Sequence, residues 1–481
     1  MEQVSSTPIN LDKARVDVRH PMLAMISMWV GAFIGMFSET SLNIALPSLM
    51  KSLGVSTATV QWLVTGYMLV IGIVLPFSSF LTKWFTTRQL IIFGLADFIV
   101  GAVVAATAST FPVLLVGRMI QGIGTGIILP LMFTVAMSIF PPHKLGAAMG
   151  TNALVIMFAP AIGPTLTGII LAKLSWQWIF WIFVPVLAVG LIFAFTSLKN
   201  VGNITKPKAD FLSMAESVVG FSAIVFGVSS ASAQGWGSPI VIVALLLGLI
   251  VLGLYAYRQL HLETPVLNLR AFKIPAFTTG ALLVMIDFGI ILSAMYLLPM
   301  YIQNGLGLVV ALTGIIMLPG GVMNALVSAL AGRLYDRLGA KGPARIGFII
   351  AFVGAMMLAT ASTTSSIAYV IAAHVIIMIG APLAMSPSQT YALNSLTGAL
   401  SADGSTIMNT MQQIIGAIAT AVATSLLGIG QAAYSGHNSA AAFTNGVHYG
   451  AYFTVALTVA GFIIALFIKR PQYSEDVKTE Q

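Results

Sequence analysis

The sequence predicts an all-α polytopic membrane protein, from its hydropathy, its scarcity of charge and the length of its apolar stretches. The chain has 481 residues, of which 58% are hydrophobic and 7% are charged, and its mean hydropathy is +0.96. A soluble domain carries about 25% charged residues, so this chain could not cover a water-facing surface of ordinary size. The composition therefore excludes a cytosolic enzyme, a secreted protein and a nucleic-acid binder.

Fourteen stretches are long and apolar enough to cross a bilayer, which takes roughly 20 residues of helix each. They are approximately 22–48, 57–82, 89–108, 112–139, 146–172, 176–197, 212–232, 238–257, 276–301, 308–331, 344–362, 367–392, 404–428 and 446–468.

The positive charges predict the orientation, because Lys and Arg collect in cytoplasmic loops. With the N-terminus inside, 19 of the 22 Lys and Arg residues lie in inner loops and tails. Lys51 and Lys173 lie in outer loops, and Arg118 lies inside a span. This distribution predicts a multi-pass protein of the cell (inner) membrane, with an even number of spans and both termini cytoplasmic. The net charge of +8 then reflects topology, not binding to nucleic acid.

An internal repeat predicts the domain organisation, because secondary transporters are often built from repeats. The segment Gly332–Lys341 resembles Ser79–Arg88, and the same offset carries Glu39 to within about a helical turn of Asp287. Two six-helix bundles then flank an extra pair of spans, which we interpret as peripheral packing. The predicted segments are an N-terminal tail at 1–21, a bundle at 22–197, a linker with the extra pair at 198–275, a second bundle at 276–468 and a C-terminal tail at 469–481.

Three ionisable residues inside predicted spans are candidates for proton coupling, since charges at membrane depth are costly and mark functional sites. Glu39 and Arg118 lie at similar depths in the first and fourth spans, so the arginine could set how tightly Glu39 holds a proton. The alternative is a structural ion pair. Asp287, in the ninth span, has no cationic neighbour on its span and is expected to bind a proton or a cation. Its alternative role is only to add negative potential to a water-filled cavity.

The enzyme alternatives find little support in the sequence. It contains no His-Glu-x-x-His, no Gly-x-Ser-x-Gly and no phosphate-binding Gly-Lys-Ser/Thr loop. The absence of cysteine excludes thiolate metal sites and thiol catalysis. We therefore expect no enzyme activity, no metal and no cofactor, with transport driven by an ion gradient or by the gradient of the substrate. A lone histidine, His374, could relay protons, although it could equally be a hydrogen-bonded packing residue.

Motifs along nearly the whole chain resemble the major facilitator superfamily, specifically its fourteen-span drug:proton antiporters. The first span ends in Phe37–Pro47, and the fourth carries Arg118-Met-Ile-Gln-Gly-Ile-Gly-Thr-Gly126. The fifth span resembles the antiporter motif C through Gly150, Gly163, Pro164 and Gly168. Glu39, where many members carry Asp, and the segment 85–88 resemble most the lincomycin-exporter branch.

The resemblance implies roles for the residues at the ends of the second and tenth spans. In the family this loop motif carries an Asp that helps to lock the cytoplasmic side, but Lys83 stands there and reverses the charge. The second copy is intact, so we expect the inner gate to depend mostly on it. The gating candidates are Lys83, Arg88, Gly332, Asp336, Arg337 and Gly339.

The resemblance implies a major facilitator fold and proton-coupled export of amphipathic or cationic drugs by a monomer in the bilayer, with lincosamides as a candidate drug class. Its Arg118 is implied to take part in proton transfer. The alternatives are export of an endogenous lipid or metabolite and, with less support, a membrane-embedded enzyme. The candidate substrate contacts are Asn43, Trp62, Tyr67, Gln121, Tyr296, Tyr301, Met317, His374 and Gln412. Packing is the competing role for the aromatic residues and for Met317.

Overall fold

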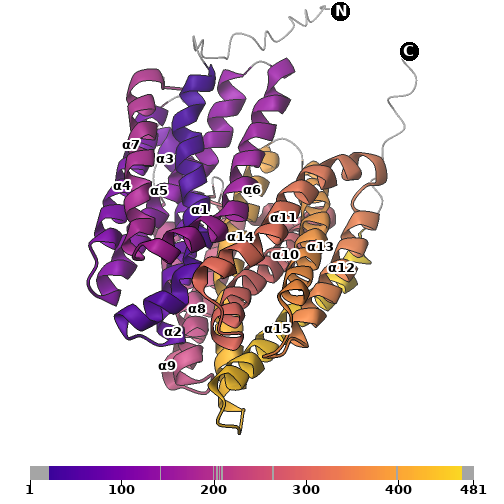
Figure 1. The fold of residues 1–481 in the computed structure, drawn as a ribbon. Coiled ribbons are helices and arrows are strands. Elements are labelled where there is room, and N and C mark those ends of the chain that lie inside the picture. Colours follow the sequence, from indigo (N-terminus) through magenta and orange to yellow (C-terminus); the bar gives the residue numbers. More distant parts are fainter. Residues whose placement is uncertain are drawn as a thin grey trace, which may run out of the picture.

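The computed structural model describes residues 21–140, 142–198, 200–201, 204, 206, 210–262, 265–396 and 399–468. Within these ranges every regular element is a helix (Figure 1). The predicted all-α fold class is confirmed. Of the predicted tails at 1–21 and 469–481, Pro21 begins α1, and the other residues lie outside the described ones.

The described helices follow one another up and down through the molecule. Their bounds are α1 Pro21–Leu53, α2 Thr57–Val60, α3 Trp62–Trp84, α4 Thr87–Ala106, α5 Phe111–Ile139, α6 Pro142–Lys173, α7 Gln177–Ser197, α8 Phe211–Gln234, α9 Pro239–His261, η2 Leu269–Lys273, α10 Pro275–Met300, η3 Tyr301–Gly305, α11 Val310–Leu338, α12 Lys341–Ala359, α13 Ile367–Asn394, α14 Ala399–Ala432 and α15 Ser439–Ala465. Thirteen of the described spans are long and apolar enough to cross a membrane, and α6, which bends between its two halves, makes up to fourteen.

Two segments predicted as loops, Ser79–Arg88 and Gly332–Lys341, are mostly helical. Helix α3 continues to Trp84, and α11 continues through Gly332 to Leu338. The interruptions between successive helices are short because capping residues end or begin a helix within a few residues. A capping box of Thr86 and Gln89 starts α4. Gly339 ends α11 at φ +67°, a conformation that favours glycine.

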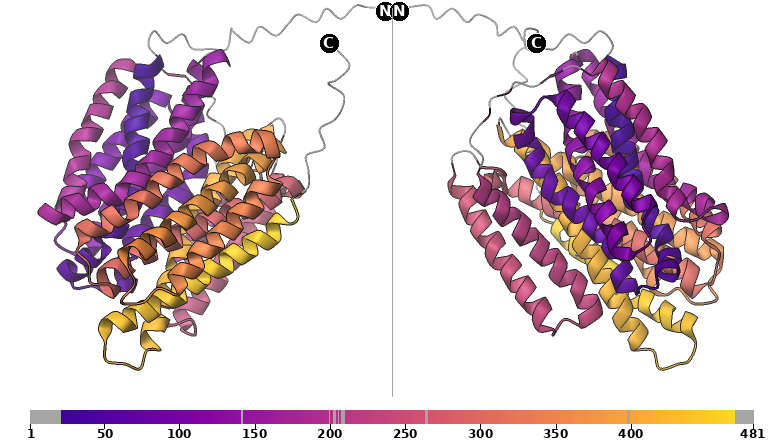
Figure 2. Two further views of the ribbon diagram at one scale, coloured as in Figure 1. Left: turned by 45° about the vertical axis from the view of Figure 1, so that its right-hand side comes forward. Right: turned by 90° about the vertical axis from the view of Figure 1, so that its left-hand side faces the viewer.

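The helices gather into two groups that lean against each other, α1–α7 and α10–α15 (Figures 1 and 2). Helix α1 begins, and α15 ends, on the same side of the molecule (Figure 2). We call this side the terminal face and the opposite side the distal face. Most of the described Lys and Arg residues lie at helix ends of the terminal face, whereas Lys51 and Lys173 lie at distal ends.

The seam between the two groups is formed mainly by α6 against α11 and by α3 against α14. The extra pair is attached at this seam, because α8 packs on both α14 and α3 while α9 packs on α8. Trp236 donates a hydrogen bond to Ser425 on α14 (3.0 Å), and Phe226 lies against Trp62 with ring centres 6.0 Å apart. Large apolar side chains of α9 point outward, as expected for a surface that meets lipid.

Candidate transport cavity

A cavity of about 410 Å³ lies at the seam, between α1, α3, α5 and α6 on one side and α10, α11, α13 and α14 on the other. Its lining residues are Met36, Glu39, Thr40, Leu75, Leu129, Phe133, Ile156, Pro160, Phe288, Ile291, Leu292, Met295, Asn324, Ser328, Pro382, Met385, Ser386, Gln389, Leu393, Ser405, Asn409, Gln412 and Gln413. Phe133, Leu393 and Ser405 lie near the terminal-face ends of their helices. The cavity therefore extends from the middle of the helices toward the terminal face.

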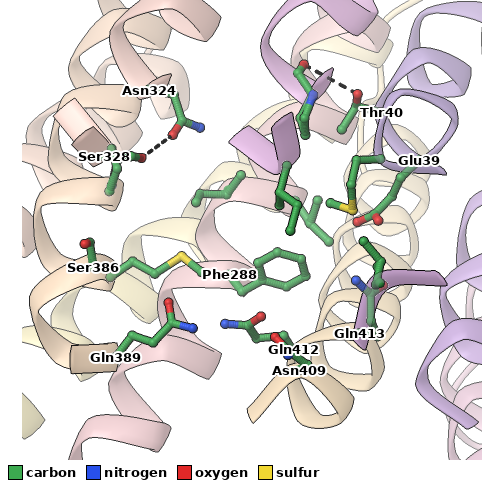
Figure 3. Close-up of a pocket in the computed structure, with 18 of the residues that line it drawn as sticks. Glu39, Thr40, Phe288, Asn324, Ser328, Ser386, Gln389, Asn409, Gln412 and Gln413 are labelled. Atoms are coloured by element: carbon green, nitrogen blue, oxygen red, sulfur yellow. Dashed lines mark hydrogen bonds between the residues drawn. The ribbon is translucent and has the colours of Figure 1, made fainter. Parts of the chain in front are cut away.

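Glu39 is the acidic residue in this lining, and its side chain is 2% exposed. Its Oε2 atom has no hydrogen-bond partner. The amide of Gln413, on α14, points toward the carboxyl and acts on it as a hydrogen-bond donor (Figure 3). A buried carboxyl between the two helix groups, with one oxygen unpartnered, is a suitable place for a proton to bind and leave.

Arg118 lies fully buried beside Glu39, but it is held by other groups. Its guanidinium donates to the Leu63 carbonyl (3.1 Å), to Gln121 Oε1 (2.9 Å) and to both the hydroxyl and the carbonyl of Ser38. It also lies 4.0 Å from the centre of the Tyr67 ring, a cation–π contact. Every one of these partners is neutral.

Arg118 and Glu39 do not form an ion pair within 4.0 Å. Among the described residues, the ion pair within this distance joins Arg258 to Asp210. The positive charge nevertheless attracts the Glu39 carboxylate. Because Ser38 directly precedes Glu39, the arginine also fixes the backbone from which the carboxyl projects. The arrangement corresponds to neither a free acid nor a locked ion pair.

Asp287 is fully buried on α10, and neither of its carboxyl oxygens has a hydrogen-bond partner among the described residues. The neighbouring residue Phe288 points into the cavity, whereas Asp287 is not part of its lining. The proposed binding of a proton or a cation by Asp287 therefore requires another conformation, in which the carboxyl is accessible.

His374 and Met317 line a second, much smaller cavity together with Pro160, Pro164 and Asn324. His374 is 2% exposed and packs closely on Gly320 of α11. Neither of its ring nitrogens has a partner among the described residues. Pro160 and Asn324 line both cavities, so His374 lies next to the central cavity without reaching it.

Of the other predicted substrate contacts, Gln412 lines the central cavity. Tyr67 and Gln121 belong to the network around Arg118, and the Tyr67 hydroxyl donates to the Gly35 carbonyl (2.9 Å). Trp62 packs against the extra pair through Phe226. In this conformation Tyr67, Gln121 and Trp62 lie outside the lining of the central cavity.

The remaining candidates are buried away from the cavity lining. The Tyr301 hydroxyl donates to the Ser362 carbonyl in a distal loop (2.6 Å). Tyr296 is fully buried on α10, and Asn43 is 2% exposed on α1 with its Oδ1 unpartnered. Their roles in substrate binding stay predictions.

The distal side of the seam is closed by direct contacts between the two groups. Thr165 donates to the Gly314 carbonyl (2.9 Å), and Gln303 donates to the Ile44 carbonyl (3.1 Å). Gly168 and Gly314 let α6 and α11 approach so closely that a Cβ on Gly314 would lie 2.7 Å from the Pro164 carbonyl oxygen. Pro164 and Gly168 of the predicted motif thus form part of the distal closure, whereas Gly163 packs on Thr40 of α1.

The predicted gating residues lie at the terminal face. Arg88 donates to the Phe195 carbonyl (2.6 Å), and the carbonyl of the exposed Lys83 accepts from the Lys206 amide (3.1 Å). Lys83 also attracts Asp403 on α14, in the other helix group. This attraction links opposite charges across the seam. It does so at Lys83, the position where the loop motif usually has Asp.

The second copy of the loop motif forms the end of α11. Arg337 lies exposed in its last turn, Gly339 ends the helix, and nothing lies within 4 Å of a Cβ built on Gly332. The side-chain surroundings of Asp336 and Gly150 lie outside the described part of the structure.

Sequence reasoning missed most of the polar lining. Ser405, Asn409, Gln412 and Gln413 lie on one face of α14, at i, i+4, i+7 and i+8. A polar stripe with this spacing on an otherwise apolar span is a recognisable signal. The predicted contacts include Gln412 but none of the other three residues of this stripe. The missed lining residues with polar side chains are Thr40, Asn324, Ser328, Ser386, Gln389, Ser405, Asn409 and Gln413.

The fold and the cavity define a multi-pass membrane protein of the transporter class, with a central cavity at the seam of two helix groups. The sequence profile of the Major Facilitator Superfamily matches residues 28–421. The chain belongs to this superfamily, so it is a transporter and not an enzyme.

Two relatives are similar along nearly their full length. The chain is 48% identical to the lincomycin resistance protein LmrB of Bacillus subtilis over 459 residues, covering 93% of this chain and 96% of the relative. It is 45% identical to the protein of the same name from Listeria monocytogenes over 457 residues, covering 94% and 97%.

Solved structures share the fold at low sequence identity. A POT family transporter in complex with 5-aminolevulinic acid superposes with a TM-score of 0.65 at 17% identity, covering 93% of this chain and 95% of the other. A D-xylose-proton symporter gives a TM-score of 0.65 at 15% identity, covering 93% and 96%.

Proposed function

We propose that the protein is a proton-coupled antiporter that exports amphipathic drugs, lincosamides among them, by alternating access. The observation that carries the proposal is the position of Glu39, a buried carboxyl with one unpartnered oxygen in the wall of the cavity at the seam. The names of the two relatives, at 48% and 45% identity, support a drug as the substrate.

The terminal face is the cytoplasmic face in this proposal, since Lys and Arg are concentrated there. The structure then corresponds to an inward-facing state, with the cavity extending toward the cytoplasm and the distal side closed. The bundles at 22–197 and 276–468 rock about the cavity, and the extra pair at the seam of α3 and α14 stays peripheral to the path.

Coupling requires only that substrate and proton stabilise different charge states of one site. Substrate enters from the cytoplasm or inner leaflet and binds while Glu39 is ionised and its proton has left to the cytoplasm. After the distal side opens, a proton from outside neutralises Glu39 and favours release of the substrate. The protonated carrier returns and releases the proton inside. Asp287 is a second candidate carboxyl, reached in another conformation.

The test is uptake of radiolabelled lincomycin into inverted membrane vesicles, with and without an imposed pH gradient, acid inside. Accumulation that follows the gradient and collapses with a protonophore supports the proposal. Equal uptake with and without the gradient contradicts proton coupling. Gradient-driven uptake of a cationic dye, with no uptake of lincomycin, contradicts lincosamides as substrates.

A further inference from the structure

The central cavity has two chemically different walls. The first helix group contributes mainly apolar side chains, including Met36, Leu75, Leu129, Phe133 and Ile156, with Glu39 and Thr40 as its polar members. The second group contributes seven apolar side chains, Phe288 among them, together with eight neutral polar ones, namely Asn324, Ser328, Ser386, Gln389, Ser405, Asn409, Gln412 and Gln413. We call these eight residues the amide wall, since five of them carry side-chain amides.

Two adjacent amides of the amide wall each have one hydrogen-bonding atom without a partner. Gln412 is 7% exposed, and its Nε2 atom has no partner in the described chain. Gln413 is 6% exposed, with Oε1 unpartnered. A buried amide without a partner is unfavourable by about 1–3 kcal/mol, so two such amides at one cavity indicate that a bound molecule completes their hydrogen bonds.

The positions of these groups suit a ligand within the cavity. Figure 3 shows Gln389 on α13 and Gln412 on α14 projecting into the cavity from different sides, near the ring of Phe288. Asn324, higher on the wall, already accepts a hydrogen bond from Ser328 (3.2 Å). The wall thus offers both donors and acceptors, and none of its side chains is charged.

We propose that the amide wall is a subsite for an uncharged, hydroxyl-rich group such as a sugar ring, while the opposite wall holds the apolar part of the same molecule. Amides donate and accept, as hydroxyls do, so an amide-lined wall matches a polyol in both roles. The eight side chains carry no charge, so the amide wall itself supplies no counter-charge for a cation. The substrate class is therefore an amphiphile with a polyol head, oriented across the seam. This inference rests on the proposed function, because it assumes that the cavity binds the transported molecule.

The two walls of the cavity belong to different helix groups. A ligand that contacts both walls links α13 and α14 to α1 and α5. Removing the polar contacts should weaken binding of polyol-bearing ligands selectively, because a site built to hydrogen-bond a hydroxyl is left unpaired when that hydroxyl is absent.

The experiment compares two probes on purified full-length protein in lipid nanodiscs. Lincomycin carries a polyhydroxylated sugar, and tetraphenylphosphonium is an apolar cation with no hydrogen-bonding group. Gln412→Leu and Asn409→Leu should each weaken lincomycin binding by about tenfold or more and change tetraphenylphosphonium binding by about twofold or less. Gln234→Leu, which changes an exposed amide at the distal end of α8, is the matched control and should alter neither.

Thermal unfolding and Gln412→Asn guard against misfolding, since the shorter amide keeps the chemistry and should retain part of the lincomycin affinity. Equal loss for both probes, or no loss for lincomycin, overturns the amide-wall proposal, as does a wild-type protein that binds only the cation. Failure of the proposed function is a different result. In that case the selective binding pattern is present, but a pH gradient drives no accumulation in vesicles.

Discussion

Arg118 binds Ser38 through both its hydroxyl and its carbonyl, and so holds the residue that directly precedes Glu39. The arginine is thereby linked to the acid through one peptide unit and not through an ion pair. Its charge still attracts the carboxylate. A change in the charge of Glu39 therefore alters the electrostatic interactions of Arg118, which also contacts Tyr67 and Gln121.

Replacing Arg118 with Lys should lower both stability and transport. Lysine keeps the charge, but it cannot reproduce the fork of donors to Leu63, Ser38 and Gln121. Each hydrogen bond from a charged group contributes about 1.5–3 kcal/mol, so the midpoint of thermal unfolding should fall by about 2 °C or more. Unchanged unfolding and transport in the purified variant would show that this network is dispensable.

Replacing Asp287 with Leu should separate stability from function. The buried carboxyl has no partner for either oxygen, so an apolar side chain of similar size should leave stability equal or higher. Proton-driven export should be lost if Asp287 binds a proton during the cycle. Thermal unfolding and vesicle uptake measured on one preparation test both parts, and a destabilised variant would contradict the inferred cost of burial.

Replacing Thr165 with Val should loosen the distal closure. The lost hydrogen bond to the Gly314 carbonyl contributes about 0.5–1.5 kcal/mol, which corresponds to a shift of roughly two- to tenfold toward distal opening. The natural chain has no cysteine, so Met317→Cys can report on access with a membrane-impermeant maleimide. Labelling from the distal side should rise with Thr165→Val, and identical labelling rates would exclude this contact from the gate.

The ion pair of Asp210 and Arg258 should make stability depend on acid pH. Burial alone raises the pKa of Asp210, but hydrogen bonds from Arg258 and Ser213 outweigh it and lower the pKa from 3.8 to about 2. The folded state therefore holds this proton less tightly than the unfolded state. The stabilisation is present above pH 4 and is lost as the pH falls from about 4 to about 2.

Asp210→Asn should remove that component of the pH dependence. The pair is part-exposed, so solvent screens it and the effect should be small. Unfolding midpoints measured between pH 2 and pH 6 provide the test. A variant with the same acid profile as the wild-type protein would show that the pair contributes nothing.

The sequence predicted most of the fold, because a bilayer imposes long apolar helices that composition reveals directly. The ends of α3 and α11 were predicted less well, since helices continue beyond the apolar core until a cap such as Gly339 ends them. For the cavity, costly charges such as Glu39 and Arg118 were detectable. The aromatic candidates were not separable from packing residues, because a side chain such as Trp62 is equally suited to a cavity and to contact with Phe226.

The most direct test of the account is proton release on substrate binding. Purified protein in weakly buffered solution near neutral pH should release protons when lincomycin is added, because the substrate favours ionised Glu39. Glu39→Gln should still fold and bind lincomycin but release none, whereas Glu216→Gln, an acid on the peripheral pair, should behave as the wild-type protein. Undiminished proton release by Glu39→Gln would contradict the central role assigned to this carboxyl.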